Sequence, residues 1–173
     1  VPVGPVHAGI IEPGHFLFSV AGEPVLNLQL RMFYTHKGVE KLFESLPVVH
    51  GVRLAESISG DSGFAHALAF CHAVERAAQR EVPPRARVLR GICLELERLY
   101  NHVADIGAIA TDVAFVVAHA RSMRIKEALL RLNEEWTGSR LLRGAAALGG
   151  MRCDADAEQT GILRKTLDVL EPE

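Results

Sequence analysis

The sequence predicts an α+β fold, with an N-terminal antiparallel β-hairpin or small sheet followed by an antiparallel helical bundle. Extended runs come first, and later apolar residues repeat every three to four positions. The length of 173 residues fits one compact domain, and 49% hydrophobic residues are typical of a globular chain. We divide the chain into a β-hairpin region (1–50), a helical bundle core (51–155) and a C-terminal helix (156–173).

The hairpin is predicted from two extended runs, residues 15–20 and 25–34, on either side of "AGEP". A glycine-containing turn between such runs favours antiparallel pairing. The segment "THKGVEKLFESL" follows, and Leu42 and Leu46 in it have the spacing of a short helix.

Helices are predicted from about residue 63 onward. "FAHALAFCHAVERAAQ" has no internal breaker, "VPP" ends it, and Pro84 suits the first turn of the next helix. The apolar residues of that next helix are spaced 3, 4, 3, 4, 3, which predicts one buried seam. They are Leu89, Ile92, Leu96, Leu99, Val103 and Ile106.

Two further helices complete the expected bundle. Asp112 is a natural N-cap for a helix over about 113–136, which ends at "TGSR". The last helix is expected over about 156–170, with Leu163, Leu167 and Leu170 on one side.

The composition excludes several function classes. Nucleic-acid binding requires a clustered basic face, and a net charge of −2 does not indicate one. The three cysteines, Cys71, Cys93 and Cys153, have neither zinc nor redox spacing, so we expect buried reduced thiols. No apolar stretch approaches the ~18 residues of a membrane span, so we expect no direct span and a membrane connection only through partners.

The stretch "ESISGDSGFAHALAF", residues 56–70, contains the Gly-Asp-Ser-Gly signature of trypsin-like proteases. That motif belongs to an all-β fold, whereas here an alanine-rich helix follows directly, so we reject the protease. The alternative is that "SGDS" holds two serines at the spacing of a Cys-x-x-Cys pair, with His66 four residues later.

Several blocks in fixed order carry a resemblance over residues 3–154. They are "VGPVHAGIIEPGHFLFSVAGE", "FYTHKGVEKL", "VPPRARVLRGICLELERLYNH", "DIGAIATDVAF", "TGSR" and "GG". The chain resembles the large subunit of membrane-bound, group 4 nickel–iron hydrogenases and the quinone-site subunit of complex I, the NADH–quinone oxidoreductase. The resemblance implies that the sequence is the N-terminal part of such a subunit, in a variant without the metal cysteines.

The resemblance gives the serine motif a meaning. In the hydrogenases this place reads Cys-Gly-x-Cys-x-x-x-His, and the cysteines bind the nickel–iron centre. Here the residues are Ser59, Gly60, Asp61, Ser62 and His66. A serine hydroxyl is a hard, weak donor that cannot replace a soft thiolate, so we expect no metal at this vacated position.

The resemblance to the quinone-site subunit implies further losses. Ile11 stands where that subunit has a quinone-binding histidine, and Gly60 where it has a tyrosine. Asp112 matches the aspartate that hydrogen-bonds that histidine. The turn from Glu12 to His15 follows the hydrogenases, in which a glutamate here relays protons. His15 is either its relay partner or a residue that orients the turn.

Each candidate also has a local explanation. Ser59, Asp61 and Ser62 could cap the following helix, and His66 could bond only to backbone at the helix start. Asp112 has the same capping alternative. Arg140, which follows a Thr-Gly break in a matched block, is either a site residue or one partner of a surface salt bridge.

We therefore expect a subunit of a membrane-bound respiratory oxidoreductase complex that is not active alone. It would form part of the cavity where electrons from an iron–sulfur partner reach a quinone-like acceptor and couple to proton movement. Its partners would be the terminal iron–sulfur subunit and membrane-arm subunits, at the cytoplasmic face of the plasma membrane. No cofactor is expected in this chain; iron–sulfur clusters belong to the partners and quinone to the complete complex. The sequence has no dinucleotide fingerprint.

Two other functions stay open. One is a structural scaffold without catalysis. The other is a mononuclear metal enzyme with Glu12, Asp61 and His66 as ligands. The coupling hypothesis makes a geometric prediction: Glu12, Asp61 and Asp112 should converge around Ser59 and Ser62, within ~10 Å of one another.

Overall fold

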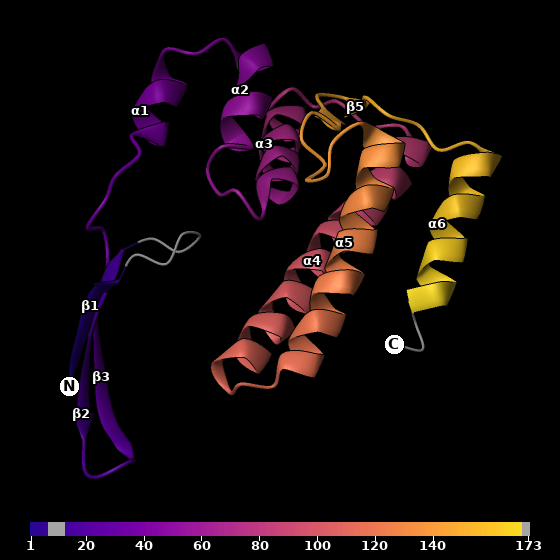
Figure 1. The fold of residues 1–173 in the computed structure, drawn as a ribbon. Helices are drawn as coiled ribbons and strands as arrows, with labels where there is room; N and C mark the ends of the chain where they lie inside the picture. The colour runs from indigo at the N-terminus through magenta and orange to yellow at the C-terminus, as the bar shows by residue number, and fades with distance from the viewer. Residues whose placement is uncertain (7–12, 171–173) are drawn as a thin grey trace. The chain divides into compact units, whose positions relative to one another are not determined.

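A computed structural model describes residues 1–6 and 13–170 (Figure 1). The predicted α+β class is confirmed, because an antiparallel sheet comes first and helices follow it. The chain divides into two compact units, Val1–Ser45 and Leu46–Glu173, and each is described by itself.

The first unit is built on a three-stranded antiparallel sheet of order β1-β2-β3. The strands are β1 (Pro2–Val6), β2 (Gly14–Val20) and β3 (Val25–Arg31). The predicted hairpin is β2 and β3, and the amide of Ala21 donates to the carbonyl of Pro24 to close its turn.

Strand β1 was not predicted, because Pro2 and Pro5 lie within it. Proline cannot donate to a ladder and is accepted at the edge of a sheet. That is where β1 lies, since β2 is its one neighbour in the sheet.

Two short helices follow the sheet. Helix α1 (Val39–Glu44) lies where a short helix was predicted, although it ends before Leu46. Helix α2 (Val48–Ala55) was not predicted, and it opens the second unit. Its buried residues, Gly51, Val52 and Ala55, lie on the side that packs against α3.

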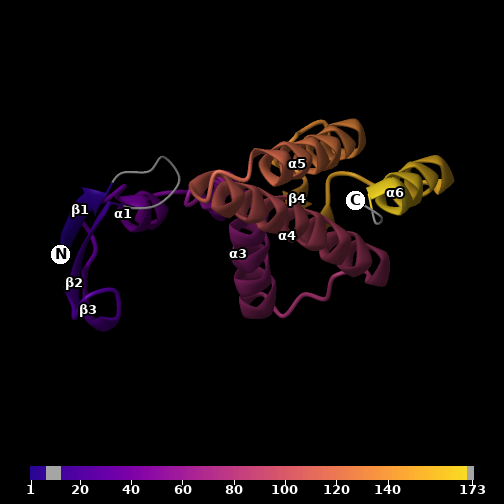
Figure 2. The ribbon, with the colours of Figure 1, turned by 60° about the horizontal axis from the view of Figure 1, so that its bottom comes forward.

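The second unit is dominated by three longer helices: α3 (Gly63–Ala77), α4 (Pro84–Asp112) and α5 (Val116–Thr137). Pro84 is the first residue of α4, as predicted. Helices α4 and α5 lie side by side as an antiparallel hairpin in both views (Figures 1 and 2).

The prediction that Asp112 caps α5 is wrong. Asp112 is the last residue of α4, and Phe115 precedes α5. The chain reverses at Ala114, which has a positive φ of 59°, and the amide of Phe115 donates to the carbonyl of Ala110. Glycine or asparagine usually takes this left-handed conformation, so alanine gave no signal of a turn.

The predicted seam of α4 is correct only in part. Leu89 and Leu96 are buried, but Leu99 is 41% exposed and Ile106 is 59% exposed. The stripe that α4 buries is shifted toward a face that contains charged and aromatic residues. Its members are Leu89, Arg90, Cys93, Leu96, Glu97, Tyr100, Gly107 and Ala110.

Gly107 allows α4 and α5 to approach closely near their turn. A Cβ on this residue would lie 2.9 Å from the Cβ of Ser122 and 2.7 Å from the terminal methyl of Met123. Real Cβ atoms do not come so close to a neighbouring Cβ, so any larger residue here forces the helices apart.

After α5 the chain forms a tight hairpin and a last helix. Strands β4 (Ala146–Ala147) and β5 (Gly150–Met151) pair antiparallel, and Gly149 has a positive φ of 78° in the turn between them. Helix α6 (Ala157–Leu170) agrees with the predicted helix over 156–170. Two of its predicted leucines, Leu163 and Leu167, line an apolar groove together with α4.

A buried ion pair joins α3, α4 and the β4–β5 hairpin. The Arg90 guanidinium donates to both carboxylate oxygens of Glu75, at 2.9 and 2.6 Å, and the two side chains are 3% and 8% exposed. Arg90 also donates to the carbonyls of Ala147 and Gly150, and Glu75 accepts the amide of Gly149. Hydrogen bonds from Arg90 are the main reason that the pKa of Glu75 is lowered.

We predict that Glu75→Gln destabilises the chain by about 3–5 kcal/mol, because it leaves the Arg90 charge buried without its counter-charge. Chemical denaturation followed by circular dichroism measures the loss. Glu81→Gln is the control, since Glu81 is 95% exposed and lies 3.8 Å from Arg87. It should cost below about 1 kcal/mol. Equal losses in the two variants would contradict the role of the buried pair.

Candidate functional site

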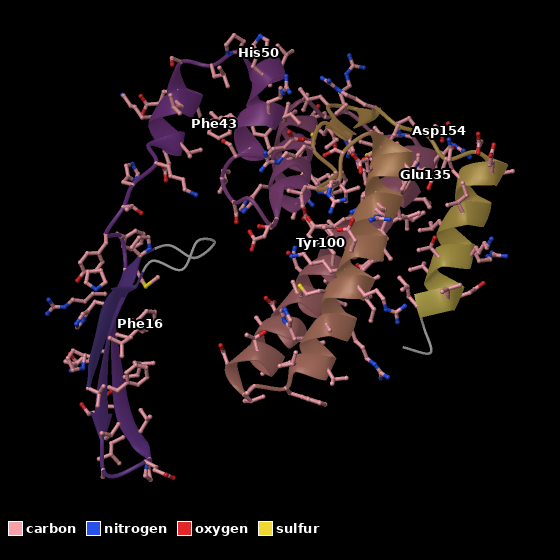
Figure 3. All side chains as sticks on the ribbon, in the orientation of Figure 1. Phe16, Phe43, His50, Tyr100, Glu135 and Asp154 are labelled. Carbon is pink, nitrogen blue, oxygen red and sulfur yellow. The ribbon has the colours of Figure 1, made fainter. Side chains whose placement is uncertain are left out.

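The serine motif lies in the loop between α2 and α3. The Ser59 hydroxyl donates to the carboxylate of Asp61, in a very short hydrogen bond. The carbonyl of Asp61 accepts from the Tyr100 hydroxyl at 3.1 Å and from the Asn101 amide at 2.7 Å. Tyr100 lies on α4 (Figure 3) and is almost fully buried, so α4 fixes the backbone of this loop.

The N-terminus of α3 is capped by a residue of another helix. Ser62 is the N-cap residue, but its side chain makes no capping hydrogen bond. The carboxylate of Glu97, in α4, accepts the amides of Phe64 and Ala65 at 2.8 Å each. The local capping expected from Ser59, Asp61 or Ser62 is therefore replaced by a tertiary contact, and the free N–H groups of the helix start are satisfied.

A second buried glutamate holds the other end of the loop. Glu56, which follows α2, is 6% exposed, and its carboxylate accepts the amide of Gly144 at 2.6 Å. Gly63 packs on the same backbone, since a Cβ there would lie 3.1 Å from the Glu56 carbonyl oxygen. Glu56 and Glu97 thus set the loop's position from opposite ends.

Burial shifts the proton affinities of the groups beneath the loop. Desolvation raises the pKa of Glu97, although the two amide hydrogen bonds oppose this, and the charge of Asp61 raises it further. Desolvation and the neighbouring Glu97 and Asp61 carboxylates also raise the pKa of Tyr100. The site therefore holds a carboxyl that retains its proton at higher pH than an ordinary glutamate.

No family model matches the chain, but individual relatives do. Hydrogenase-4 component G of Escherichia coli is 39% identical over 160 residues, which is 92% of this chain and 29% of that protein. NADH-quinone oxidoreductase subunit 4 of Thermus thermophilus is 32% identical over 168 residues, which is 97% of this chain and 41% of the relative. The chain is homologous, over nearly its whole length, to subunits of hydrogenases and of NADH–quinone oxidoreductases. It spans less than half the length of either relative.

A solved structure agrees on the fold. The membrane-bound sulfane sulfur reductase, described as an archaeal respiratory membrane complex, contains a chain that superposes with a TM-score of 0.85. The match covers 99% of this chain and 46% of that one, at 24% identity. The two chains therefore share a fold.

Five of the predicted site residues lie together at the start of α3. Ser59, Gly60, Asp61 and Ser62 form the loop, and His66 lies in the first turn of the helix, where its amide donates to the carbonyl of Ser62 at 3.2 Å. Gly60 is exposed, and a Cβ on it would meet nothing within 4 Å.

Asp112 does not join this group. It follows Asn101, which contacts Asp61, by eleven residues in α4, or about 16 Å along the axis at about 1.5 Å per residue. Asp61 and Asp112 therefore lie at different levels of α4, and their approach within ~10 Å stays a sequence-based prediction. Asp112 is exposed at the far end of the helix.

The N-terminal candidates cannot be added to the site. Glu12 and Ile11 lie outside the described residues. His15 lies in β2 opposite Arg31, in the first compact unit. Glu12 and His15 consequently stay sequence-based predictions.

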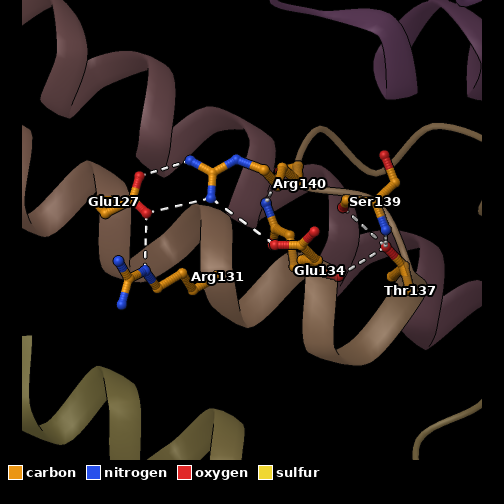
Figure 4. A network of polar contacts seen from close by, with 7 residues as sticks. Glu127, Arg131, Glu134, Thr137, Ser139 and Arg140 are labelled. Atoms are coloured by element: carbon orange, nitrogen blue, oxygen red, sulfur yellow. Dashed lines mark hydrogen bonds and ion pairs between the residues drawn. The ribbon is translucent and has the colours of Figure 1, made fainter.

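Arg140 lies in an ion-pair network on α5 (Figure 4). Its guanidinium donates to both carboxylate oxygens of Glu127, at 3.2 and 2.6 Å, and lies 3.9 Å from Glu134. Arg131 donates to Glu127 as well. The side chains of Arg140 and Glu127 are each 41% exposed, which agrees with the surface salt bridge that was the simpler interpretation of Arg140.

The described part of the chain contains no cluster of metal-binding side chains. Among residues 1–6 and 13–170, no three His, Cys, Asp or Glu side chains are arranged to hold a metal ion. The donors at Ser59 and Ser62 are hydroxyls, and the Ser59 hydroxyl already bonds to Asp61. This donor set does not fit a thiolate-bound nickel–iron centre.

We predict that Glu97→Gln destabilises the chain by about 1–3 kcal/mol, because a glutamine offers one oxygen to two buried amides and leaves one of them unsatisfied. Glu95→Gln is the matched control, since Glu95 lies in the same helix, is 59% exposed and pairs with Arg98. It should change stability by less than about 0.5 kcal/mol. Urea denaturation compares them, and a Glu97 variant as stable as the control would refute the capping role.

The Glu127 network makes a prediction about pH. Hydrogen bonds from Arg140 and Arg131 lower the pKa of Glu127 to about 2. A carboxyl whose pKa is depressed in the folded state contributes its full stabilisation at pH values above its ordinary pKa of about 4.3. That stabilisation is lost as the pH falls toward about 2. Thermal melts should show the advantage of the native chain over Glu127→Gln shrinking in that window.

Glu135→Gln, an exposed glutamate on the same helix (Figure 3), controls for general acid effects. The difference in melting temperature between Glu135→Gln and the native chain should change less between pH 5 and 2 than the corresponding difference for Glu127→Gln. A Glu127→Gln difference that is constant down to pH 2 would exclude the network as the cause.

Proposed function

We propose that this chain is part of a subunit of a membrane-bound respiratory oxidoreductase complex of the hydrogenase and NADH–quinone oxidoreductase type. It forms part of the cavity where electrons from an iron–sulfur partner reach a quinone-like acceptor, and it works without a nickel–iron centre. The observation that carries the proposal is the relationship to hydrogenase-4 component G combined with serine at both positions of the metal-binding motif.

The donor chemistry supports a metal-free site. A nickel–iron centre needs soft thiolate ligands, and Ser59 and Ser62 supply neutral hydroxyls. The Ser59 hydroxyl keeps its proton and donates it in a hydrogen bond to the Asp61 carboxylate. A metal ligand at this position would instead have to lose that proton. In this proposal, Ser59 and Ser62 form part of the polar wall of the acceptor cavity.

Asp61, Tyr100 and Glu97 would handle protons there. The Asp61 carboxylate accepts a hydrogen bond from Ser59 at the vacated position. Glu97 lies under the loop, and burial and the charge of Asp61 raise its pKa. A negative charge that arrives on an acceptor nearby would raise the proton affinity of the Glu97 carboxyl further, which couples reduction to proton uptake. Glu12 remains a further candidate from the sequence.

The surface supports attachment through partner subunits. None of the helices that the structure describes is both long enough and apolar enough to cross a membrane. The turn between α4 and α5 nevertheless exposes a group of large apolar side chains, of the kind that marks protein contacts. They are Ile106, Ile109, Val113, Phe115, Val116 and Val117. We expect the terminal iron–sulfur subunit and membrane-arm subunits as partners, at the cytoplasmic face of the membrane.

A structural scaffold is the second candidate. It is favoured by the separation of Asp112 from Asp61 and by the surface position of Arg140. In a scaffold, the serine loop keeps its hydrogen bonds only because they hold α3 and α4 together.

The complete complex distinguishes these functions. We expect Asp61→Asn to slow reduction of a short-chain quinone by the dithionite-reduced complex at least tenfold, with a matching loss of proton uptake in vesicles. Asp105→Asn, at an exposed position of α4, is the control and should leave both rates unchanged. The purified complex should contain no stoichiometric nickel bound by this subunit.

Unchanged rates in an assembled Asp61→Asn complex would refute the coupling role and favour the scaffold. Nickel bound at Ser59 and Ser62 would overturn the proposal as a whole.

A further inference from the structure

Two cysteines that lie 60 positions apart in the sequence, Cys93 and Cys153, meet in the second unit. Cys93 lies in the buried stripe of α4 and is 0% exposed, whereas Cys153 follows β5 and is half-buried against the same core. Cys153 also lines a hollow with Leu89, which lies one turn before Cys93 on α4. The interaction between the two side chains is the largest cause of the pKa shift of each thiol. All three cysteines are free thiols in the structure. Linear spacing could not predict that Cys93 and Cys153 pack against the same core.

The segment that carries Cys153 is fastened to α4 on both sides of this residue. Before it, the Arg90 guanidinium binds the carbonyl of Gly150 at 3.1 Å. After it, Arg85 donates to the carboxylate of Asp154 at 2.8 Å and to the carbonyl of Ala155 at 2.6 Å. Asp154 lies in the turn before α6 (Figure 3). These bonds hold the segment that carries Cys153 against the part of α4 that carries Cys93.

The two thiols differ in access and in acidity. Cys153 borders an open hollow of about 290 Å³ that Arg85, Leu89 and Arg152 also line, so a small reagent can reach its sulfur. The interaction with Cys93 lowers the pKa of the Cys153 thiol, whereas the interaction with Cys153, together with burial, raises the pKa of Cys93. Cys153 is thus the more acidic and the more accessible thiol, as expected of an attacking cysteine.

We propose that Cys93 and Cys153 form a reversible redox modification site, in which a small peroxide oxidises Cys153 and Cys93 resolves the product as a disulfide. This function is independent of the proposed role of the serine loop. It assigns a role to residues that the electron and proton chemistry does not use.

The chemistry balances with hydrogen peroxide as the oxidant. The Cys153 thiolate attacks one peroxide oxygen, the O–O bond breaks, and hydroxide leaves and takes up a proton to become water, which gives a sulfenic acid on Cys153. The sulfur of Cys93 then attacks the Cys153 sulfur, the S–O bond breaks, and the hydroxyl leaves as water with the Cys93 proton. Two thiols lose two electrons and two protons, and one peroxide becomes two waters.

The third cysteine is an internal control. Cys71 is 0% exposed in α3, and burial raises its pKa, so it should neither react with peroxide nor join the pair. It also lies on a different tryptic peptide. Cleavage after arginine gives residues 54–76 with Cys71, residues 91–98 with Cys93 and residues 153–164 with Cys153.

The experiment treats the native full-length chain with equimolar hydrogen peroxide, blocks free thiols with N-ethylmaleimide and analyses tryptic peptides by mass spectrometry. We expect a product in which peptides 91–98 and 153–164 are joined with the loss of two hydrogens, and dithiothreitol should reverse it. Before oxidation, Cys153 should react with N-ethylmaleimide at least tenfold faster than Cys93 or Cys71.

Two variants test the division of roles. Cys71→Ser should still form the joined product, because Cys71 takes no part. Cys93→Ala should stop at the sulfenic acid, trapped with dimedone on peptide 153–164, or go on to the sulfinic acid. A native chain that gives no joined product while Cys153 is over-oxidised would overturn the proposal, as would a joined product that contains Cys71. The experiment on the native chain needs no variant, so it tests the proposal even if Cys93→Ala folds poorly.

Discussion

The pair of Arg90 and Glu75 is the interaction on which the arrangement of the second unit depends. A buried charge is costly unless its partner and all its hydrogen bonds are in place. Glu75 supplies the counter-charge from α3, and the β4–β5 hairpin supplies two carbonyls and one amide. Three segments must therefore assemble together, and no one of them can shift without exposing an unsatisfied charge.

The serine loop follows the same rule on a smaller scale. Glu97 satisfies the first amides of α3, and Glu56 satisfies the amide of Gly144. Each carboxylate is remote in the sequence from the amide that it satisfies, and Glu97 in addition replaces a local cap of α3. The geometry of the candidate site is thus set by α4 and by the chain after α5, while the loop itself supplies Ser59 and Asp61.

Sequence patterns could predict the parts that depend on neighbouring residues. The 3–4 spacing and Pro84 located α4, and the turn "AGEP" located the hairpin of β2 and β3. The motif also located Asp61 and His66. Glu97 was missed because a lone glutamate among charged residues looks like a solvated helix face, and its partners lie 32 and 33 positions away. The turn at Ala114 was missed because nothing but tertiary packing makes an alanine adopt a left-handed conformation.

The close contact at Gly107 divides the α4–α5 hairpin into two regions of unequal resistance to opening. Toward Arg90, α4 buries large side chains such as Leu96 and Tyr100, whereas beyond Gly107 it buries little more than Ala110. Separating the helices near their turn exposes little additional apolar surface, so local unfolding there needs far less free energy than at the other end. The last turns of the hairpin can consequently adjust to a neighbouring surface while the Arg90 end of α4 stays rigid.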